Sequence, residues 1–156
     1  GGEFVRKQLL AETAARPPAS KAWRVHATLT KAEVDTYLFL RFIYPTALDL
    51  AEADMLAFES KVPAGQRTPN QLLVILHEKD GSDYLAHTGR SLGAPGVSQT
   101  FVPLSRFQLA GWSQDENGRL DAASVAEIRI GWGGYFGAKD EIVEFSVAGL
   151  QTVKEP

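Results

Sequence analysis

The stretch 120-LDAASVAEIRIGWGGYFG-137 decides the fold. After a polar turn its residues alternate in character, with Ile128, Ile130 and Trp132 on one face and Glu127 and Arg129 on the other. Alternation with a period of two residues predicts a β-strand with one face in the core. Trp132 keeps the parity of the isoleucines, so we expect it in the core.

The glycines that follow Trp132 predict that this strand breaks into a Gly-rich tip. Tyr135 and Phe136 lie on that tip, between Gly134 and Gly137. Aromatic side chains on glycines form either a hydrophobic corner or a flat surface for a ligand. We expect Tyr135 to be the exposed platform.

A second segment has the same pattern as the opening stretch. LDLAEADMLAF at Leu48–Phe58 aligns without gaps on LDAASVAEIRI at Leu120–Ile130. Both indicate an Asp-capped turn that leads into a strand. A short helix over Leu50–Met55 is the alternative.

The rest of the chain consists of short β-type runs separated by turn signals. We expect strands at Phe4–Leu10, Trp23–Leu29, Thr36–Tyr44, Leu72–Leu76, Tyr84–Ala86, Val97–Val102 and Glu141–Val153. Pro45 should end the third of these strands, Asp80-Gly81 should form a hairpin turn, and Gly149 should be a bulge. Short strands with at most one-turn helices indicate an all-β antiparallel sandwich.

The composition limits the classes of partner. The chain has 156 residues, a formal net charge of −3 and no cysteine. This excludes a broad basic surface for nucleic acid, a thiolate metal site and a disulfide framework. No apolar run approaches the roughly 20 residues of a membrane helix, and Gly1-Gly2-Glu3 does not resemble a signal peptide. We expect a single module over residues 1–156, with a linker-like loop at 11–21, that has been cut from a longer protein.

Three segments resemble a known family. They are LDLAEADMLAFESKVP at 48–63, LLVILHEKDGSDYLAH at 72–87, and TFVPLSRF at 100–107 followed by LDAASVAEIRIGWGGYFG and the final strand. Together they are similar to the jelly-roll, galactose-binding-like carbohydrate-binding modules that are appended to polysaccharide-degrading enzymes. The resemblance implies a jelly roll and a non-catalytic module that binds polysaccharide through a concave sheet face or an edge loop. It also implies a covalently linked catalytic domain, a monomer and secretion from a bacterium.

The resemblance also implies a structural calcium ion, for which an aspartate in the last strand is commonly a ligand. Here EFSVAGL has Ala148 and Gly149 at that place. Glu3, Asp140 and Glu144 remain as candidate oxygen ligands.

A sugar site needs flat aromatic rings for the apolar face of the sugar and planar polar groups for its hydroxyls. The side chains that alternation places away from the core form the predicted ligand-binding groove: Arg24, His26, Tyr37, Phe39, Arg41, His77 and Arg129, with Tyr135 on the edge loop. An ordinary solvated face, with Phe39 covered by Pro17-Pro18, is the alternative. Trp112, in a polar loop, fits either environment.

The sequence contains no catalytic signature. It lacks a Gly-x-Ser-x-Gly elbow and a phosphate loop, and its three histidines do not have the spacing of a zinc motif. Two functions therefore remain beside glycan binding. One is a structural sandwich within a larger glycan-active enzyme. The other is a small jelly-roll lyase or hydrolase, with Tyr37 and either His26 or His77 as its reactive pair.

Overall fold

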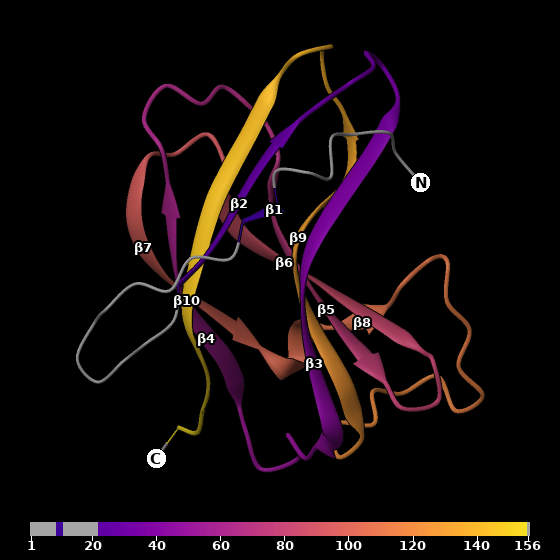
Figure 1. Ribbon diagram of the computed structural model, residues 1–156. Coiled ribbons are helices and arrows are strands. Elements are labelled where there is room, and N and C mark those ends of the chain that lie inside the picture. The colour runs from indigo at the N-terminus through magenta and orange to yellow at the C-terminus, as the bar shows by residue number, and fades with distance from the viewer. Residues whose placement is uncertain (1–8, 11–21, 156) are drawn as a thin grey trace.

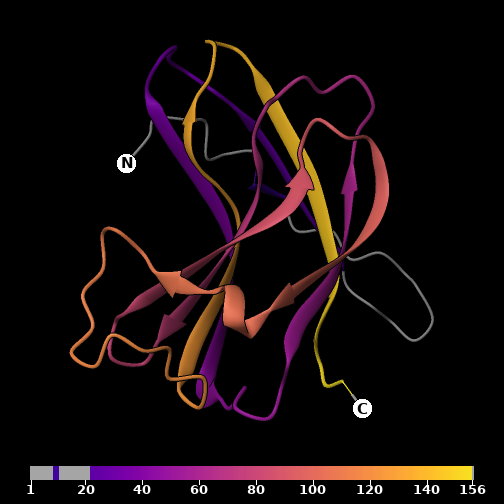
Figure 2. The same ribbon diagram turned by 180° about the vertical axis from the view of Figure 1, so that it is seen from behind.

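The computed structural model describes residues 9–10 and 22–155 and has ten strands in two stacked antiparallel sheets (Figure 1). One sheet has the order β1-β2-β10-β4-β7, with β1 at Leu9–Leu10, β2 at Ala22–Thr28, β4 at Met55–Val62, β7 at Gly96–Pro103 and β10 at Ile142–Val153. The other has the order β3-β9-β5-β6-β8, with β3 at Asp35–Leu48, β5 at Gln71–Glu78, β6 at Asp83–Ser91, β8 at Gln108–Leu109 and β9 at Val125–Phe136. The predicted all-β antiparallel sandwich is confirmed, and its helical content within the described residues is one 3-10 turn at Leu104–Arg106, which Figure 2 shows between β7 and β8.

The hydrophobic core fills the space between the two sheets. Its largest fully buried side chains include Trp132 of β9, Phe145 of β10 and Phe58 of β4. Trp132 and Phe145 meet edge to face across the sheets, with ring centroids 6.1 Å apart. The prediction that Trp132 belongs to the core is confirmed.

Strand β5 is central in its sheet, and its continuous apolar run Leu72–Leu76 is typical of such a strand. It pairs with β9 along one edge and with β6 along the other, and Leu72–Leu76 is buried throughout. The predicted hairpin follows it, with Gly81 at a φ of 99°. The predicted bulge at Gly149 is also confirmed, because the pairing of β10 with β4 shifts register between Ala148 and Gln151.

The two Leu-Asp segments form turns that lead into strands, and no helix forms over Leu50–Met55. The Asp49 side chain accepts a hydrogen bond from the Ala51 amide, 2.9 Å away, and β4 begins at Met55. The second segment likewise turns before β9 begins at Val125. Both turns agree with the prediction of a turn that leads into a strand, but the aspartate side chain caps only the first, since the Asp121 backbone carbonyl accepts from the Ser124 amide in the second.

Two predicted strand ends are wrong. Strand β3 continues through Pro45 to Leu48, since it lies at the edge of its sheet and its pairing with β9 is irregular between Ile43 and Leu48. Strand β9 continues through the glycines to Phe136, because β3 pairs with it as far as Asp35. The Gly-rich segment is therefore part of the sheet and not a loop tip.

Part of the predicted organisation lies outside the described residues. This applies to most of the first strand at Phe4–Leu10, of which Leu9–Leu10 pairs with β2, and to the linker-like loop at 11–21. Within residues 22–155 no helix is long and apolar enough to span a bilayer.

Candidate functional site

The outward face of the sheet β3-β9-β5-β6-β8 carries a continuous network of charged side chains. Neighbouring strands bring Arg41, Arg129 and Ile75 into one row, and Ile43, Glu127, His77 and Asp83 into the next. All of these have the parity opposite to that of the core residues Leu40, Ile128, Leu76 and Tyr84. We call the set Arg41, Asp83, Trp112, Glu127, Arg129 and His77 the polar face.

Glu127 is the centre of one half of the polar face. Arg41 donates to both of its carboxylate oxygens, with Nε 3.0 Å from Oε2 and Nη2 2.5 Å from Oε1. Arg129 adds a third hydrogen bond from Nε, at 2.9 Å. These guanidinium groups lower the pKa of Glu127 to about 2, with the Arg41 hydrogen bonds as the largest cause. Glu127 is therefore a fixed carboxylate, although only 8% of its surface is exposed.

Asp83 is the centre of the other half. Its Oδ1 lies 2.6 Å from Nδ1 of His77 and 3.6 Å from Nη1 of Arg129. Its Oδ2 accepts a hydrogen bond of 2.8 Å from the indole Nε1 of Trp112. The backbone of Asp83 is held as well, since its amide donates to Ser113 Oγ and its carbonyl accepts from the Ala110 amide.

Trp112 is an exposed aromatic group at one end of this face. The loop after β8 carries it, and 63% of its surface is accessible although Asp83 anchors its indole edge. At the other end of the sheet, Tyr37 and Phe39 of β3 flank Gly133 of β9, whose missing side chain leaves room for the Phe39 ring. The face therefore has planar polar groups in the middle and aromatic side chains at both ends.

The structure brings together five of the predicted ligand-binding residues. Tyr37, Phe39, Arg41, His77 and Arg129 all lie on this outward face. The predicted cover of Phe39 by Pro17-Pro18 lies outside the described residues.

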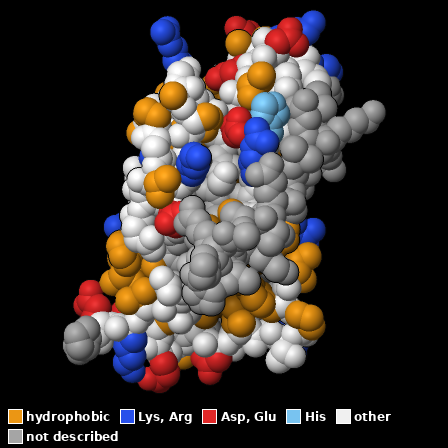
Figure 3. Space-filling view, turned by 60° about the vertical axis from the view of Figure 1, so that its left-hand side comes forward, with side chains coloured by type: hydrophobic (Ala, Val, Ile, Leu, Met, Phe, Trp, Pro, Cys, Tyr) orange, Lys and Arg blue, Asp and Glu red, His pale blue; other side chains and the backbone are white. Residues whose placement is uncertain are grey.

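Arg24 and His26 do not belong to this surface, and the expectation of one common groove is wrong. Both lie on β2 of the other sheet, because the chain crosses between the sheets after Leu29. There both side chains form ion pairs with Glu144 of β10. His26 Nδ1 lies 3.3 Å from Oε2 of Glu144, and Arg24 Nε contacts Oε1 of the same carboxylate. Figure 3 shows a histidine beside basic and acidic side chains on this side of the molecule.

Tyr135 is not the exposed platform that the sequence predicts. Only 9% of its surface is accessible, and its hydroxyl donates a hydrogen bond to Glu141. Burial and that carboxylate raise its pKa. Because Tyr135 pairs with Thr36, Tyr135 stays within the sheet, and its ring lies in the core.

Sequence reasoning missed Asp83 and Glu127 as site residues. Glu127 has outward parity in an alternating strand, which marks it as a face residue but not as the acceptor for two arginines. The contact of Asp83 with Trp112 joins the first residue of β6 to the loop after β8. These residues are far apart in the sequence, so no short-range sequence pattern predicts the contact.

The predicted calcium ligands are not brought together. Glu3 lies outside the described residues, Asp140 is exposed, and Glu144 is engaged by Arg24 and His26. Among residues 22–155, Glu78, Asp80 and Asp115 are the group whose ligand atoms lie within 4.8 Å of one another. Two of these carboxylates already accept hydrogen bonds within the protein. Asp80 accepts from the Ser82 amide, and Asp115 accepts from the Tyr84 hydroxyl.

Fold and site together define a jelly-roll sandwich with a polar, aromatic-ended sheet face. The structure is similar to the family 11 carbohydrate-binding module of the cellulosomal cellulase Lic26A-Cel5E of Clostridium thermocellum. The two share 14% identity over 94% of this chain and 81% of that one, with a TM-score of 0.64. A structure of a family 11 module from the same organism, in complex with a β-1,3-1,4-mixed-linked tetrasaccharide, has 13% identity and a TM-score of 0.64 over 93% of this chain and 82% of that one.

A structure of an exo-β-agarase also matches, at 11% identity and a TM-score of 0.57. The match covers 99% of this chain and 23% of the agarase chain. No protein-family model matches the chain, and no curated protein matches its sequence. At these identities the likeness shows the fold, which is the jelly roll of carbohydrate-binding modules.

Proposed function

We propose that the protein is a non-catalytic carbohydrate-binding module and that the polar face is its glycan site. The observation that carries the proposal is the hydrogen bond from Trp112 to Asp83, which holds an exposed indole beside a row of guanidinium and carboxylate groups. A fixed aromatic plane can stack on the C–H face of a sugar at low entropic cost. Planar charged groups next to it can bond the hydroxyls at the rim of the same sugar.

The charge balance of the polar face favours a neutral glycan. Arg41 and Arg129 are matched by Glu127 and Asp83, so neither guanidinium is left to pair with an acidic sugar. The four strands from β3 to β6 span about 14 Å at the usual spacing of 4.8 Å, which is longer than one sugar ring. We therefore expect an oligosaccharide stretch and not a single residue to lie on this face.

The same groups argue against glycoside hydrolysis on the polar face. A glycosidase needs a carboxylic acid that keeps its proton until it protonates the leaving oxygen. Glu127 has a pKa of about 2 and is ionised at any working pH. In this proposal its role is to accept hydrogen bonds and to hold two arginines in place.

The similar solved structures support this proposal at the level of the fold, since they include family 11 modules and one complex with a tetrasaccharide. We propose in addition that the chain is monomeric and is a module of a larger secreted protein that carries a catalytic domain. Its role there is to keep the catalytic domain close to insoluble or long-chain substrate.

The test is calorimetry against a panel of neutral and acidic polysaccharides, with analysis of the same samples for new reducing or unsaturated ends. We expect binding to a neutral glycan without products. Trp112→Ala should weaken that binding about tenfold or more, whereas Phe101→Ala, which removes a comparably exposed ring from the opposite sheet, should not. Turnover would identify an enzyme, and the absence of binding to every glycan would favour a purely structural sandwich.

A further inference from the structure

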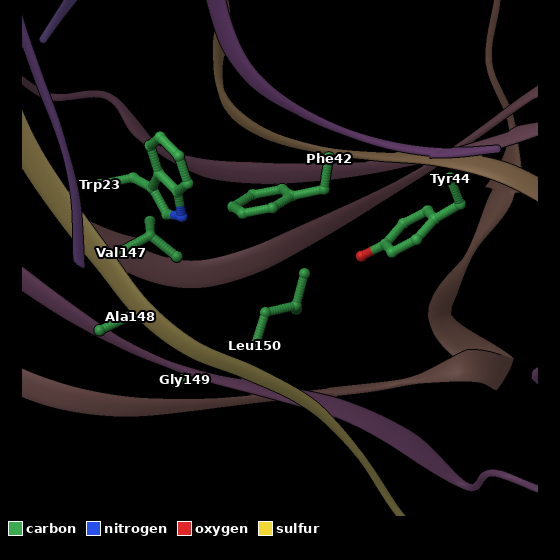
Figure 4. A pocket seen from close by; sticks show the side chains of 7 residues that line it. All are labelled: Trp23, Phe42, Tyr44, Val147, Ala148, Gly149 and Leu150. Carbon is green, nitrogen blue, oxygen red and sulfur yellow. The ribbon is translucent and has the colours of Figure 1, made fainter. Parts of the chain in front are cut away.

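A cavity of about 260 Å³ lies on the other side of β3, between this edge strand of one sheet and strands β2 and β10 of the other sheet. Its walls are aromatic and aliphatic: Trp23 of β2, Phe42 and Tyr44 of β3, and Val147–Leu150 of β10 (Figure 4). Phe42 and Tyr44 have core parity, opposite to that of Arg41 of the polar face. The strand therefore separates this cavity from the polar face.

Two aromatic rings make a corner in the cavity. The Trp23 and Phe42 rings are nearly perpendicular, at 86°, with centroids 6.5 Å apart. An occupant can thus lie flat on one ring while its edge touches the other. The volume is just below the roughly 300 Å³ at which pockets for drug-sized ligands begin, so it suits a single ring.

Two hydrogen-bonding side-chain groups point into the same space. Figure 4 shows the indole nitrogen of Trp23 and the hydroxyl of Tyr44 directed toward the middle of the cavity. Among the described residues, 9–10 and 22–155, neither group has a hydrogen-bond partner. A hydrocarbon occupant would cover both groups without replacing their hydrogen bonds to water, which is unfavourable.

The bulge of β10 adds backbone groups at the same place. The register of β10 against β4 skips the two residues Gly149 and Leu150, and β2 begins opposite Ala148. The ladder of this sheet therefore does not pair the main chain at the bulge within the described residues. Bulges of this kind are often found next to binding sites.

We propose that this cavity is a second binding site, for a single pyranose ring such as the terminal residue of a glycan. The ring's C–H face lies on one of the two aromatic rings, Trp23 or Phe42, and its edge touches the other. Its hydroxyls accept from the Trp23 indole and the Tyr44 hydroxyl and bond the main chain at Gly149. The site is distinct from the polar face and takes one sugar where the polar face takes several.

The experiment is an NMR titration of the ¹⁵N-labelled protein that follows its tryptophan indole N–H signals. The probes are the methyl glycosides of glucose, galactose, mannose and xylose, each added to high millimolar concentration, with cyclohexanol as a ring that lacks the hydroxyl rim. We expect saturable movement of the Trp23 signal with at least one glycoside and no movement with cyclohexanol. Trp132 is fully buried and serves as the internal reference.

Two variants separate this site from the polar face. Tyr44→Phe removes one hydrogen bond without changing the shape of the cavity and should weaken glycoside binding about 2- to 10-fold. Trp112→Ala should leave the movement of the Trp23 signal unchanged, even where it abolishes oligosaccharide binding. A Trp23 signal that no glycoside moves, that cyclohexanol moves equally, or that Tyr44→Phe does not affect would overturn the proposal and leave the function of the polar face intact.

Discussion

Replacing Glu127 with glutamine should destabilise the protein in a pH-dependent way. The side chain is almost fully buried on the polar face, and its carboxylate accepts three hydrogen bonds from Arg41 and Arg129. Its pKa falls from the ordinary 4.5 to about 2 in the folded protein. Each pH unit between these values is worth about 1.4 kcal/mol, so the ionised carboxylate contributes about 3 kcal/mol to the free energy of unfolding at neutral pH. Because 54% of the Arg41 side chain is exposed and water screens its charge, we expect a measured loss of about 2 kcal/mol.

The pH dependence has a definite sign. A group whose pKa is lower in the folded than in the unfolded protein contributes its full stabilisation above the unfolded value. The contribution is then lost as the pH falls from about 4.5 towards 2. Urea unfolding of the wild type and of Glu127→Gln, measured between pH 7 and pH 2.5, should therefore give curves that differ most above pH 5 and converge below it.

The matched control is Glu116→Gln, which removes a carboxylate from an exposed loop position. It should leave the unfolding free energy unchanged at every pH. The reasoning is refuted if Glu127→Gln is as stable as the wild type at pH 7, or if the difference between them stays constant down to pH 2.5.

Two further substitutions test the fold around β9. Gly131→Ala would place a Cβ 1.9 Å from the carbonyl oxygen of Leu38, so we expect a loss of about 1–3 kcal/mol in urea unfolding; Gly111→Ala, which has open space around it, should be neutral and is the control. Tyr135→Phe removes the hydrogen bond to Glu141 and should cost about 1 kcal/mol of stability without changing glycan affinity in calorimetry. Weaker glycan binding by Tyr135→Phe at unchanged stability would show that the tyrosine is a ligand-binding group after all.

The features that depend on local patterns could be predicted from the sequence. Alternation in β2, in β3 and in β9 as far as Trp132 assigns each side chain to the correct side of its own strand, because the period of two residues is a property of a single strand. The turn at Asp80-Gly81 and the bulge at Gly149 likewise depend on the backbone freedom of one glycine each.

The features that depend on strand order could not be predicted in this way. Arg24 and Tyr37 both have outward parity, but β2 and β3 belong to different sheets, so these side chains lie on opposite surfaces. Tyr135 follows glycines that indicate an exposed tip, but pairing with Thr36 from a distant part of the sequence extends the strand and buries the ring. The contact between Asp83 and Trp112 is also long-range, since it depends on the pairing of β6 with β8.

Strand β3 connects the two proposed sites physically. Its odd-numbered side chains, such as Arg41, face the polar face, and its even-numbered ones, such as Phe42 and Tyr44, face the cavity. A shift of register by one residue would exchange the two sets, so both sites depend on the same pairing with β9. That pairing is regular from Leu38 to Ile43, so it includes Arg41 of the polar face and Phe42 of the cavity, whereas Tyr44 lies just beyond it. A glycan chain that crosses the polar face and one that ends in the cavity would therefore contact opposite faces of a single strand.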